Sequence, residues 1–412
     1  MNGVTTKSSK PLQGIKVLEL GTLIAGPFCT RILGEFGAEV IKIEAPGAGD
    51  PLRSWRKLYQ GTSLWWYVQA RNKQSVAVNL KHPEGAAIVR QLAREADMVV
   101  ENFRPGVLEK LGLGWEALSA ENPGLVMVRL SGFGQTGPYK DQPGFGAVGE
   151  AMGGLRYTTG FPDRPPVRTG ISIGDSIAAL WAAIGGLMAL RHREVNGGKG
   201  QVVDVALYEA VFAMMESLVP EFDVLGFIRE RSGNVMPGIT PSSTHTTRDG
   251  KHLIIGANGD AIFKRFMQAI GRADLADDAQ LASNAGRDTR ADELYALIDA
   301  WVASHDADHV FEVLAQAQVP ASPLFSVADM FGDPQYLARA MLESSRLPDG
   351  RAFKMPGIVP KLSETPGSTE WLGPRLGEHT ESVLTSLGYA AEEIDRLCAE
   401  GAVERSTNDT AK

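Results

Sequence analysis

The sequence predicts an α/β fold, with a large domain built on a parallel sheet and a second, smaller α/β domain. Apolar, β-prone runs alternate with segments of helical spacing, and this alternation is typical of parallel sheets. The 46 glycines lie mainly in short loops between the apolar runs rather than in a repeat. A chain of 412 residues with 43% hydrophobic content is long enough for two or three packed units.

The first half of the chain supplies the expected sheet. Its strands are short apolar runs at residues 15–20, 38–44, 75–80, 97–102 and 125–130. Between the first two, FCTRILGEFG has helical spacing and a terminal glycine, and Pro83 begins a second helical run. The loop SGFGQTGPYKDQPGFG after the last strand is too rich in glycine and proline for regular structure. Its glycines allow the backbone to approach a ligand closely.

The second half of the chain predicts a buried helix at 175–193, then the strand VVDVAL and a helix at 208–218. Residues 220–247 have an irregular pattern. The smaller domain follows, with a strand in KHLIIGA and helices at 261–271, 291–304 and 307–318. A turn-rich stretch leads to a helical region from 378 that we expect to rejoin the large domain. The expected boundaries are therefore 1–225 for the large domain, 226–330 for the small domain, and 331–412 for a linker and C-terminal return.

Charge and composition exclude several classes of partner. The net charge of −8 leaves no broad basic field, so we expect neither nucleic acid nor a membrane as a partner. The apolar run 177–190 is too short to span a bilayer, and the first ten residues lack the apolar core of a secretion signal. Cys29 and Cys398 stand alone, which predicts no disulfide framework and no metal site. A cytoplasmic location fits these features.

Common catalytic motifs do not occur in the sequence: we find no P-loop, no GxSxG elbow and no HExxH pair. The histidines are scattered, and none forms an obvious ligand pair. Asp175 differs, because it follows a glycine at the entrance to an apolar helix in RTGISIGDSIAALW. From spacing alone it is a structural helix N-cap or a reactive carboxylate, and the two interpretations are compatible. The helix dipole would favour the ionised carboxylate, which can attack a thioester.

Six segments in order resemble the signature blocks of class III coenzyme A (CoA) transferases. They are LEL-GTLIAGPFCTRILGEFGAEVIKIEAPGAGDPLR, NKQSVAVNLKHPEG, DMVVENFRPGVLEKLGLGWEAL, RLSGFGQTGPY, ISIGDSIAAL and GGKGQVVDVALYEA. The resemblance continues more weakly through the C-terminal half. It implies a Rossmann-like large domain and an interlocked homodimer.

The resemblance also implies roles for individual residues. Asp175 matches the nucleophilic aspartate of the family. Arginine and lysine suit the phosphates of CoA. The residues that match the CoA site are Val78, Asn79, Leu80, Lys81, Asn102, Phe103, Arg104 and Lys110. CoA and its thioesters are then substrates, with no tightly bound cofactor, and the second substrate is a small carboxylic acid.

The implied reaction moves CoA from an acyl-CoA donor to a carboxylic acid acceptor through an aspartyl anhydride and an aspartyl–CoA thioester. We expect a succinyl-type donor and a dicarboxylic acceptor. No general base is required, because each attacking group is already an anion. Backbone amides near 132–137 or at Gly174 are candidate donors to the oxyanion. Arg168 is either a surface residue or a partner for a second carboxylate. The region SGNVMPGITPSST lacks a tetraglycine run, which disfavours oxalate as a substrate.

Two alternatives stay open. An α-methylacyl-CoA racemase of the same fold family needs a histidine as well as the aspartate, and this chain has Gly144, Phe145 and Gly146 where racemases carry a GHD-like triplet. Gly146 and Glu150 also depart from the aspartate and glutamine of many transferases. A catalytically silent acyl-CoA-binding protein is the third hypothesis, and the presence of Asp175 argues against it.

Overall fold

The computed structural model describes residues 10–406 and divides into two compact units. Unit 1 holds the residues up to Leu155, Thr169–Val219 and the chain from Ala340 onward, and unit 2 holds Arg156–Arg168 and Pro220–Arg339. These boundaries differ from the expected ones, which lay between residues 225 and 226 and between residues 330 and 331. The assignment of residues 156–168 to unit 2 was also not expected. The backbone of this segment is hydrogen-bonded within unit 2, where Gly233 N–H donates to Gly160 O at 2.9 Å.

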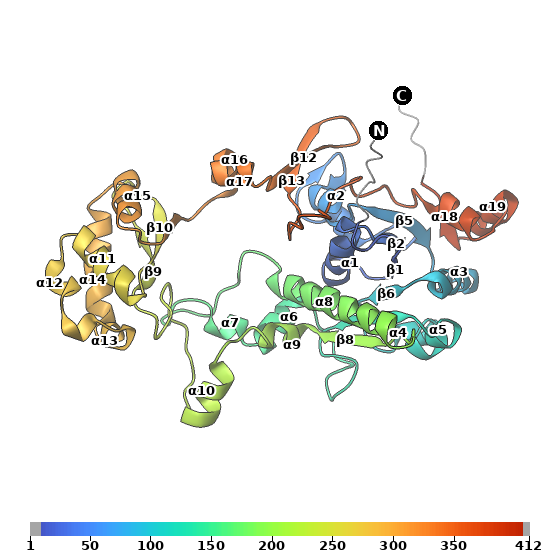
Figure 1. Cartoon of the computed structure of the whole chain (residues 1–412). Helices are drawn as coiled ribbons and strands as arrows, with labels where there is room; N and C mark the ends of the chain where they lie inside the picture. Colours follow the sequence, from blue (N-terminus) through green and yellow to red (C-terminus); the bar gives the residue numbers. More distant parts are fainter. Residues whose placement is uncertain (1–9, 407–412) are drawn as a thin grey trace, which may run out of the picture. The chain divides into compact units, whose positions relative to one another are not determined.

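The sheet of unit 1 (Figure 1) contains seven strands in the described chain, and their order is β14–β5–β2–β1–β6–β7–β8. Their bounds are β1 Lys16–Glu19, β2 Glu39–Glu44, β5 Lys73–Val78, β6 Met98–Glu101, β7 Val126–Ser131, β8 Val202–Ala206 and β14 Val403–Glu404. All neighbours pair in parallel except β14, which runs antiparallel to β5. The predicted α/β fold with a parallel sheet is confirmed.

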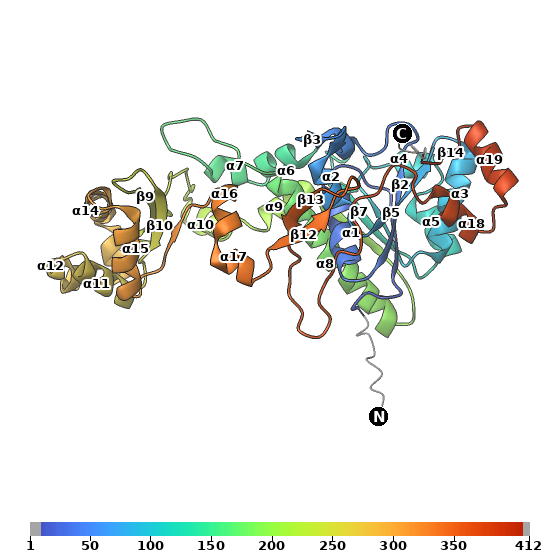
Figure 2. The same cartoon turned by 90° about the horizontal axis from the view of Figure 1, so that it is seen from above.

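Helices cover both faces of this sheet (Figures 1 and 2), as a parallel sheet requires. One core packs the sheet against α3, α5, α18 and α19, and the other packs it against α1, α8 and α9. The helices of unit 1 are α1 Ala25–Glu35, α2 Leu64–Gln69, α3 Pro83–Glu95, α4 Val107–Lys110, α5 Trp115–Glu121, α6 Gly146–Met152, α8 Ile173–Val195, α9 Leu207–Phe212, α18 Thr380–Ser386 and α19 Ala391–Ala399. Two small hairpins and a 3-10 turn complete it: β3 Leu58–Tyr59 with β4 Thr62–Ser63, β12 Leu342–Arg346 with β13 Ala352–Pro356, and Pro51–Ser54.

The long helix α8 begins two residues before the predicted start, at Ile173, and Ser172 occupies its N-cap position. Asp175 is therefore not the N-cap but the acidic residue of the first turn. The dipole argument still applies there, because the first-turn amides lack helical partners. The 23-residue α8 contains an 18-residue window with a mean hydropathy of 1.6, so it is long and apolar enough to cross a membrane by length and composition, unlike the run 177–190 alone. Its alanines, including Ala178, Ala179 and Ala182, pack in the core of unit 1.

Unit 2 contains the antiparallel sheet β11–β10–β9 with helices packed on it. The strands are β9 Ser242–Thr246, β10 His252–Gly256 and β11 Ala321–Pro323. The helices and a short 3-10 turn are α11 Asp260–Ala269, α12 Ala273–Ala276, Ala279–Leu281, α13 Asn284–Asp288, α14 Ala291–Ala303, α15 Ala307–Gln316, α16 Val327–Gly332 and α17 Pro334–Ala338. Two further helices, α7 Leu155–Thr158 and α10 Leu218–Leu225, span the points where the chain passes between the units.

Two expected elements differ from the structure. The stretch 220–247, expected to be irregular, contains most of α10 and the strand β9. The helix expected at 208–218 ends at Phe212, and a turn separates it from α10. Alternation in β9 is weak because its residues SSTHT are polar, and its place in the sheet is fixed by pairing with β10. The first nine residues, in which a secretion signal was not expected, lie outside the described part.

Candidate active site

The strand order of unit 1 reverses between β1 and β6. From β1 the chain adds β2 and β5 on one side, and from β6 it adds β7 and β8 on the other. Open α/β sheets bind ligands at the carboxyl ends of the strands where this reversal occurs. The loop at residues 20–24 after β1 and the segment that begins at Asn102 after β6 meet at this place. The Asn102 amide joins them, because Oδ1 accepts from Thr22 N–H and Nδ2 donates to Thr22 O, both at 2.8 Å.

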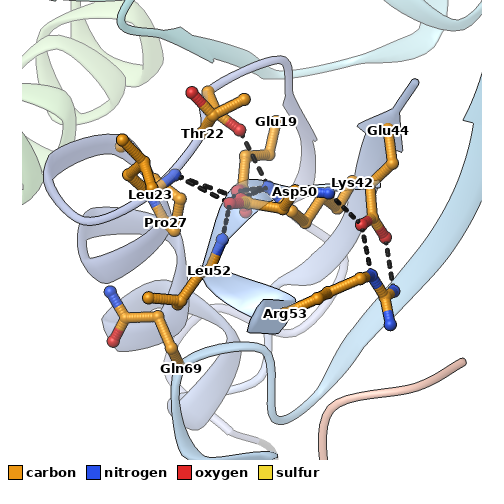
Figure 3. A network of polar contacts seen from close by, with 12 residues as sticks. Glu19, Thr22, Leu23, Pro27, Lys42, Glu44, Asp50, Leu52, Arg53 and Gln69 are labelled. Carbon is orange, nitrogen blue, oxygen red and sulfur yellow. Dashed lines mark hydrogen bonds and ion pairs between the residues drawn. The ribbon is translucent and has the colours of Figure 1, made fainter. Parts of the chain in front are cut away.

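A buried ion network lies beside the loop at residues 20–24 and holds it (Figure 3). Lys42 Nζ lies 2.7 Å from Glu19 Oε1 and 2.9 Å from Asp50 Oδ2. Burial acts to lower the pKa of Lys42, but the two carboxylates outweigh it and the pKa is raised. Asp50 also accepts the Leu23 N–H at 3.0 Å. The lysine therefore positions a carboxylate that in turn fixes the backbone of the loop.

A cleft of about 570 Å³ opens at this edge of the sheet, a size typical of small-molecule sites. Its lining combines apolar side chains with two lysines and is formed by Leu20, Thr22, Ile43, Glu44, Ala45, Pro46, Gly49, Asp50, Val78, Asn79, Leu80, Lys81, Phe103, Val107, Lys110 and Leu111. The structure thus brings together six of the eight residues predicted for the CoA site. The two that do not line the cleft are Asn102, which bonds the loop, and Arg104, which is exposed.

Asp175 lies in unit 1 against the start of α6. An ideal Cβ built on Gly146 would fall 2.1 Å from Asp175 Oδ2, so this glycine backbone is in close contact with the carboxylate. The buried Glu150, also on α6, accepts the Gly174 N–H at 3.3 Å. Gly134 N–H donates to Ser131 Oγ at 2.9 Å. Two of the amides suggested as oxyanion donors therefore already have partners, and the residues that stabilise an oxyanion stay unassigned.

A second pocket, of about 400 Å³, lies beside the same turn of α8. Sequence analysis missed it, because its residues come from separate segments: Ile24, Phe28, Arg31, Arg56, Trp65, Gln69, Gly170, Ile171, Ser172 and Ser176. Ser172 and Ser176 flank Asp175 along the helix. Ile24 ends the loop whose earlier residues Leu20 and Thr22 line the cleft. The loop at residues 20–24 therefore borders both cavities.

A family model described as CoA-transferase family III matches residues 12–380. The chain belongs to this family. It is 50% identical over 392 residues to the Succinyl-CoA--D-citramalate CoA-transferase of Chloroflexus aurantiacus, with 95% of this chain and 97% of the relative covered. It is 34% identical to the Succinate--glutarate CoA-transferase of Agrobacterium fabrum, with 92% and 96% covered. A crystal structure of a CAIB/BAIF family protein from Brucella suis matches with a TM-score of 0.81 and 34% identity, over 92% of this chain and all of that one.

The resemblance noted in the sequence is confirmed, and the protein is a family III CoA-transferase. Its relatives of this kind use CoA thioesters as substrates. Within residues 10–406 no group of three or more histidine, cysteine and acidic side chains is placed to hold a metal ion. Arg168, one candidate partner for a second carboxylate, is exposed and belongs to unit 2. In unit 1 of the transferase, Arg31 and Arg56 line the pocket beside the helix turn that carries Asp175.

Proposed function

We propose that this transferase moves CoA from succinyl-CoA to a dicarboxylic acid, with Asp175 as the covalent carrier. The observation that supports this role is the place of Asp175, in the first turn of α8, against Gly146 and between two serines that line a cationic pocket. The named relatives support the substrates, since they pair succinyl-CoA or succinate with citramalate or glutarate.

The proposed reaction proceeds by exchange of anions. A carboxylate oxygen of Asp175 attacks the thioester carbonyl, the C–S bond breaks, and a succinyl–aspartyl anhydride forms as the CoA thiolate leaves. The thiolate then attacks the Asp175 carbonyl, succinate departs, and an aspartyl–CoA thioester remains. The acceptor carboxylate repeats both steps in reverse order and leaves as its CoA thioester, which regenerates the Asp175 carboxylate. Nucleophilic catalysis of this kind divides one difficult transfer into easier steps.

The first experiment combines trapping with substitution. Hydroxylamine added during turnover with succinyl-CoA should modify Asp175, which peptide mapping by mass spectrometry detects. Asp175→Asn should lower kcat by at least about 10³-fold, because the amide is no nucleophile. Asp292→Asn is the matched control, since Asp292 is also in the first turn of a helix, α14, but in unit 2. An unmodified position 175, or full activity of Asp175→Asn, would refute the proposal.

The same assay separates the alternatives. A panel of carboxylic acids with succinyl-CoA should give new acyl-CoA products if the protein transfers CoA. Deuterium entering the α-carbon of a branched acyl-CoA would instead indicate the racemase, although positions 144–146 contain no histidine. Binding of acyl-CoA without turnover would indicate the silent protein.

We also propose that the chain forms homodimers. One face of α8 is apolar and exposed in the single chain, with residues spaced as one helical stripe: Leu180, Trp181, Ile184, Leu187 and Met188. Monomers rarely leave such a contiguous apolar surface uncovered, and a self-complementary patch suits a two-fold dimer. The cytoplasmic location stays a prediction.

A further inference from the structure

Arg31 is a cation enclosed in the protein interior. It lies on α1, and only 17% of its side chain is exposed. Its Nη1 donates to Gln69 Oε1 at 3.3 Å, and its guanidinium carbon lies 4.3 Å from the centre of the Phe28 ring. Burial is the main reason that the pKa of Arg31 falls to about 10, so the side chain is still charged at neutral pH. A charge enclosed in this way calls for an anion.

The nearest carboxylate, Glu35, already has another partner. Arg71 approaches Glu35 Oε1 with Nη2 at 2.5 Å and donates from Nε at 2.7 Å. Arg31 Nε lies 3.0 Å from the same oxygen, but this nitrogen forms no hydrogen bond among the described residues. Glu35 therefore lies between two arginines, and among the described residues only Arg71 is hydrogen-bonded to its carboxylate. Glu343 is placed against Arg71, at 3.5 Å, and not against Arg31.

The pocket beside Arg31 has the composition of a site for a short acid. Phe28 and Trp65 supply apolar walls, and Ser172 and Ser176 bring the lining to the helix turn that carries Asp175. Gln69 fixes the geometry, because its amide accepts from Arg31 and donates to Ile24 O at 3.2 Å. Gln69 itself is buried, and Figure 3 shows it beside the loop at residues 20–24.

We propose that Arg31 binds the distal carboxylate of the dicarboxylic acyl group whose other end reacts at Asp175. Arginine suits this task, because its planar fork can pair with both oxygens of a carboxylate. The assignment rests on the proposed function and makes Arg31 the residue that selects dicarboxylic over monocarboxylic substrates. The exposed Arg56 lines the same pocket. The phosphates of CoA are assigned to the separate cleft, where Lys81 and Lys110 lie.

The test compares two donors of equal chain length, succinyl-CoA and butyryl-CoA. In a ping-pong reaction kcat/KM for the donor reports the first half-reaction alone, so the acceptor does not enter. Arg31→Gln should lower kcat/KM for succinyl-CoA by about 10- to 100-fold, the loss expected of a charge-assisted hydrogen bond. The value for butyryl-CoA should change by less than about threefold. Arg31→Lys, which keeps the charge but not the fork, should fall between wild type and Arg31→Gln.

A matched control and a binding measurement complete the design. Arg94→Gln removes an exposed arginine of α3 that pairs with Glu121, and it should leave both donors unchanged. Calorimetry should show weaker succinate binding to Arg31→Gln, with unchanged CoA binding. Equal losses for both donors, or weaker CoA binding with unchanged succinate binding, would overturn the assignment. If the wild-type protein binds succinate through Arg31 but transfers no CoA, the proposed function is refuted and the assignment of Arg31 to a carboxylate stands.

Discussion

The carboxylate of Asp175 lies against the backbone of Gly146, where no side chain separates the two. Any residue larger than glycine places an atom within 2.1 Å of Oδ2, which is impossible without movement. The end of an aspartate side chain can rotate away at small cost in stability. A substitution at Gly146 should therefore act on the orientation of the nucleophile rather than on folding.

We predict that Gly146→Ala lowers kcat at least about tenfold, since misplaced reacting groups lose a large part of the benefit of orientation, while the thermal midpoint changes little. Steady-state kinetics and calorimetry measure the two effects. Gly256→Ala in β10 is the control, because a Cβ there meets nothing within 4 Å. Unchanged kcat in Gly146→Ala would show that the carboxylate reacts from another position.

The two cysteines differ in environment, which gives a second residue-scale prediction. Burial, aided by the charge of Glu19, raises the pKa of Cys29 to about 12, whereas Cys398 is only partly buried. The thiolate is the reactive form. Iodoacetamide at pH 8 should therefore label Cys398 in the folded protein well before Cys29, as judged by peptide mapping. Faster labelling of Cys29 would contradict the buried environment.

At the scale of elements, the loop between β1 and α1 is held from three directions. Asn102 bonds Thr22 from the end of β6, Asp50 accepts the Leu23 N–H, and Gln69 of α2 donates to Ile24 O. The loop borders both cavities, so its position determines where a thioester can meet Asp175. Asn102 therefore positions the loop, whereas the family resemblance placed Asn102 among the residues that line the CoA site.

Asn102→Ala removes both hydrogen bonds to Thr22 and removes the side chain that lies beside Gly21. At about 1 kcal/mol for each bond, we expect kcat/KM for acyl-CoA to fall about 10- to 50-fold. Hydrogen exchange measured by mass spectrometry should show faster exchange of peptides that contain the loop. Slower turnover with unchanged exchange would instead indicate direct contact of Asn102 with CoA.

At the scale of the whole molecule, the central sheet carries buried charges that tie stability to pH. Glu19 accepts from Lys42 and from Lys73, each at 2.7 Å. Burial acts to raise the pKa of Glu19, but the two lysines lower it below the ordinary 4.5. A carboxyl group with a lowered pKa contributes stability above its unfolded value, and this contribution is lost as the pH falls through the folded value.

The free energy of unfolding should therefore decline as the pH is lowered below about 4.5. Glu19→Gln should cost about 3–5 kcal/mol at pH 7, because Lys73 loses its buried carboxylate and Lys42 keeps only one of its two. The variant should also flatten the decline. Urea unfolding between pH 3 and 7 measures both effects. A Glu19→Gln variant with the wild-type pH dependence would place the titrating groups elsewhere.

The apolar stripe of α8 gives the prediction for assembly. Sedimentation should find the wild-type chain as a dimer. Ile184→Glu should weaken that dimer, because it places a charge in the centre of the stripe. Lys264→Glu, on the exposed surface of α11 in unit 2, is the control for added negative charge. A monomeric wild-type chain would refute the proposed homodimer.

The sequence by itself determined the α/β class, the strands of the parallel sheet and the position of Asp175 at the start of an apolar helix. These depend on periodicity and on turn residues, which act between near neighbours in the chain. Only the tertiary structure decided that Arg31 lines a pocket together with Ser172 and Ser176, that Asn102 bonds the loop after β1, and that 156–168 belongs to unit 2. Such placements arise from packing between residues far apart in sequence, and no local pattern records which distant side chains share a cavity.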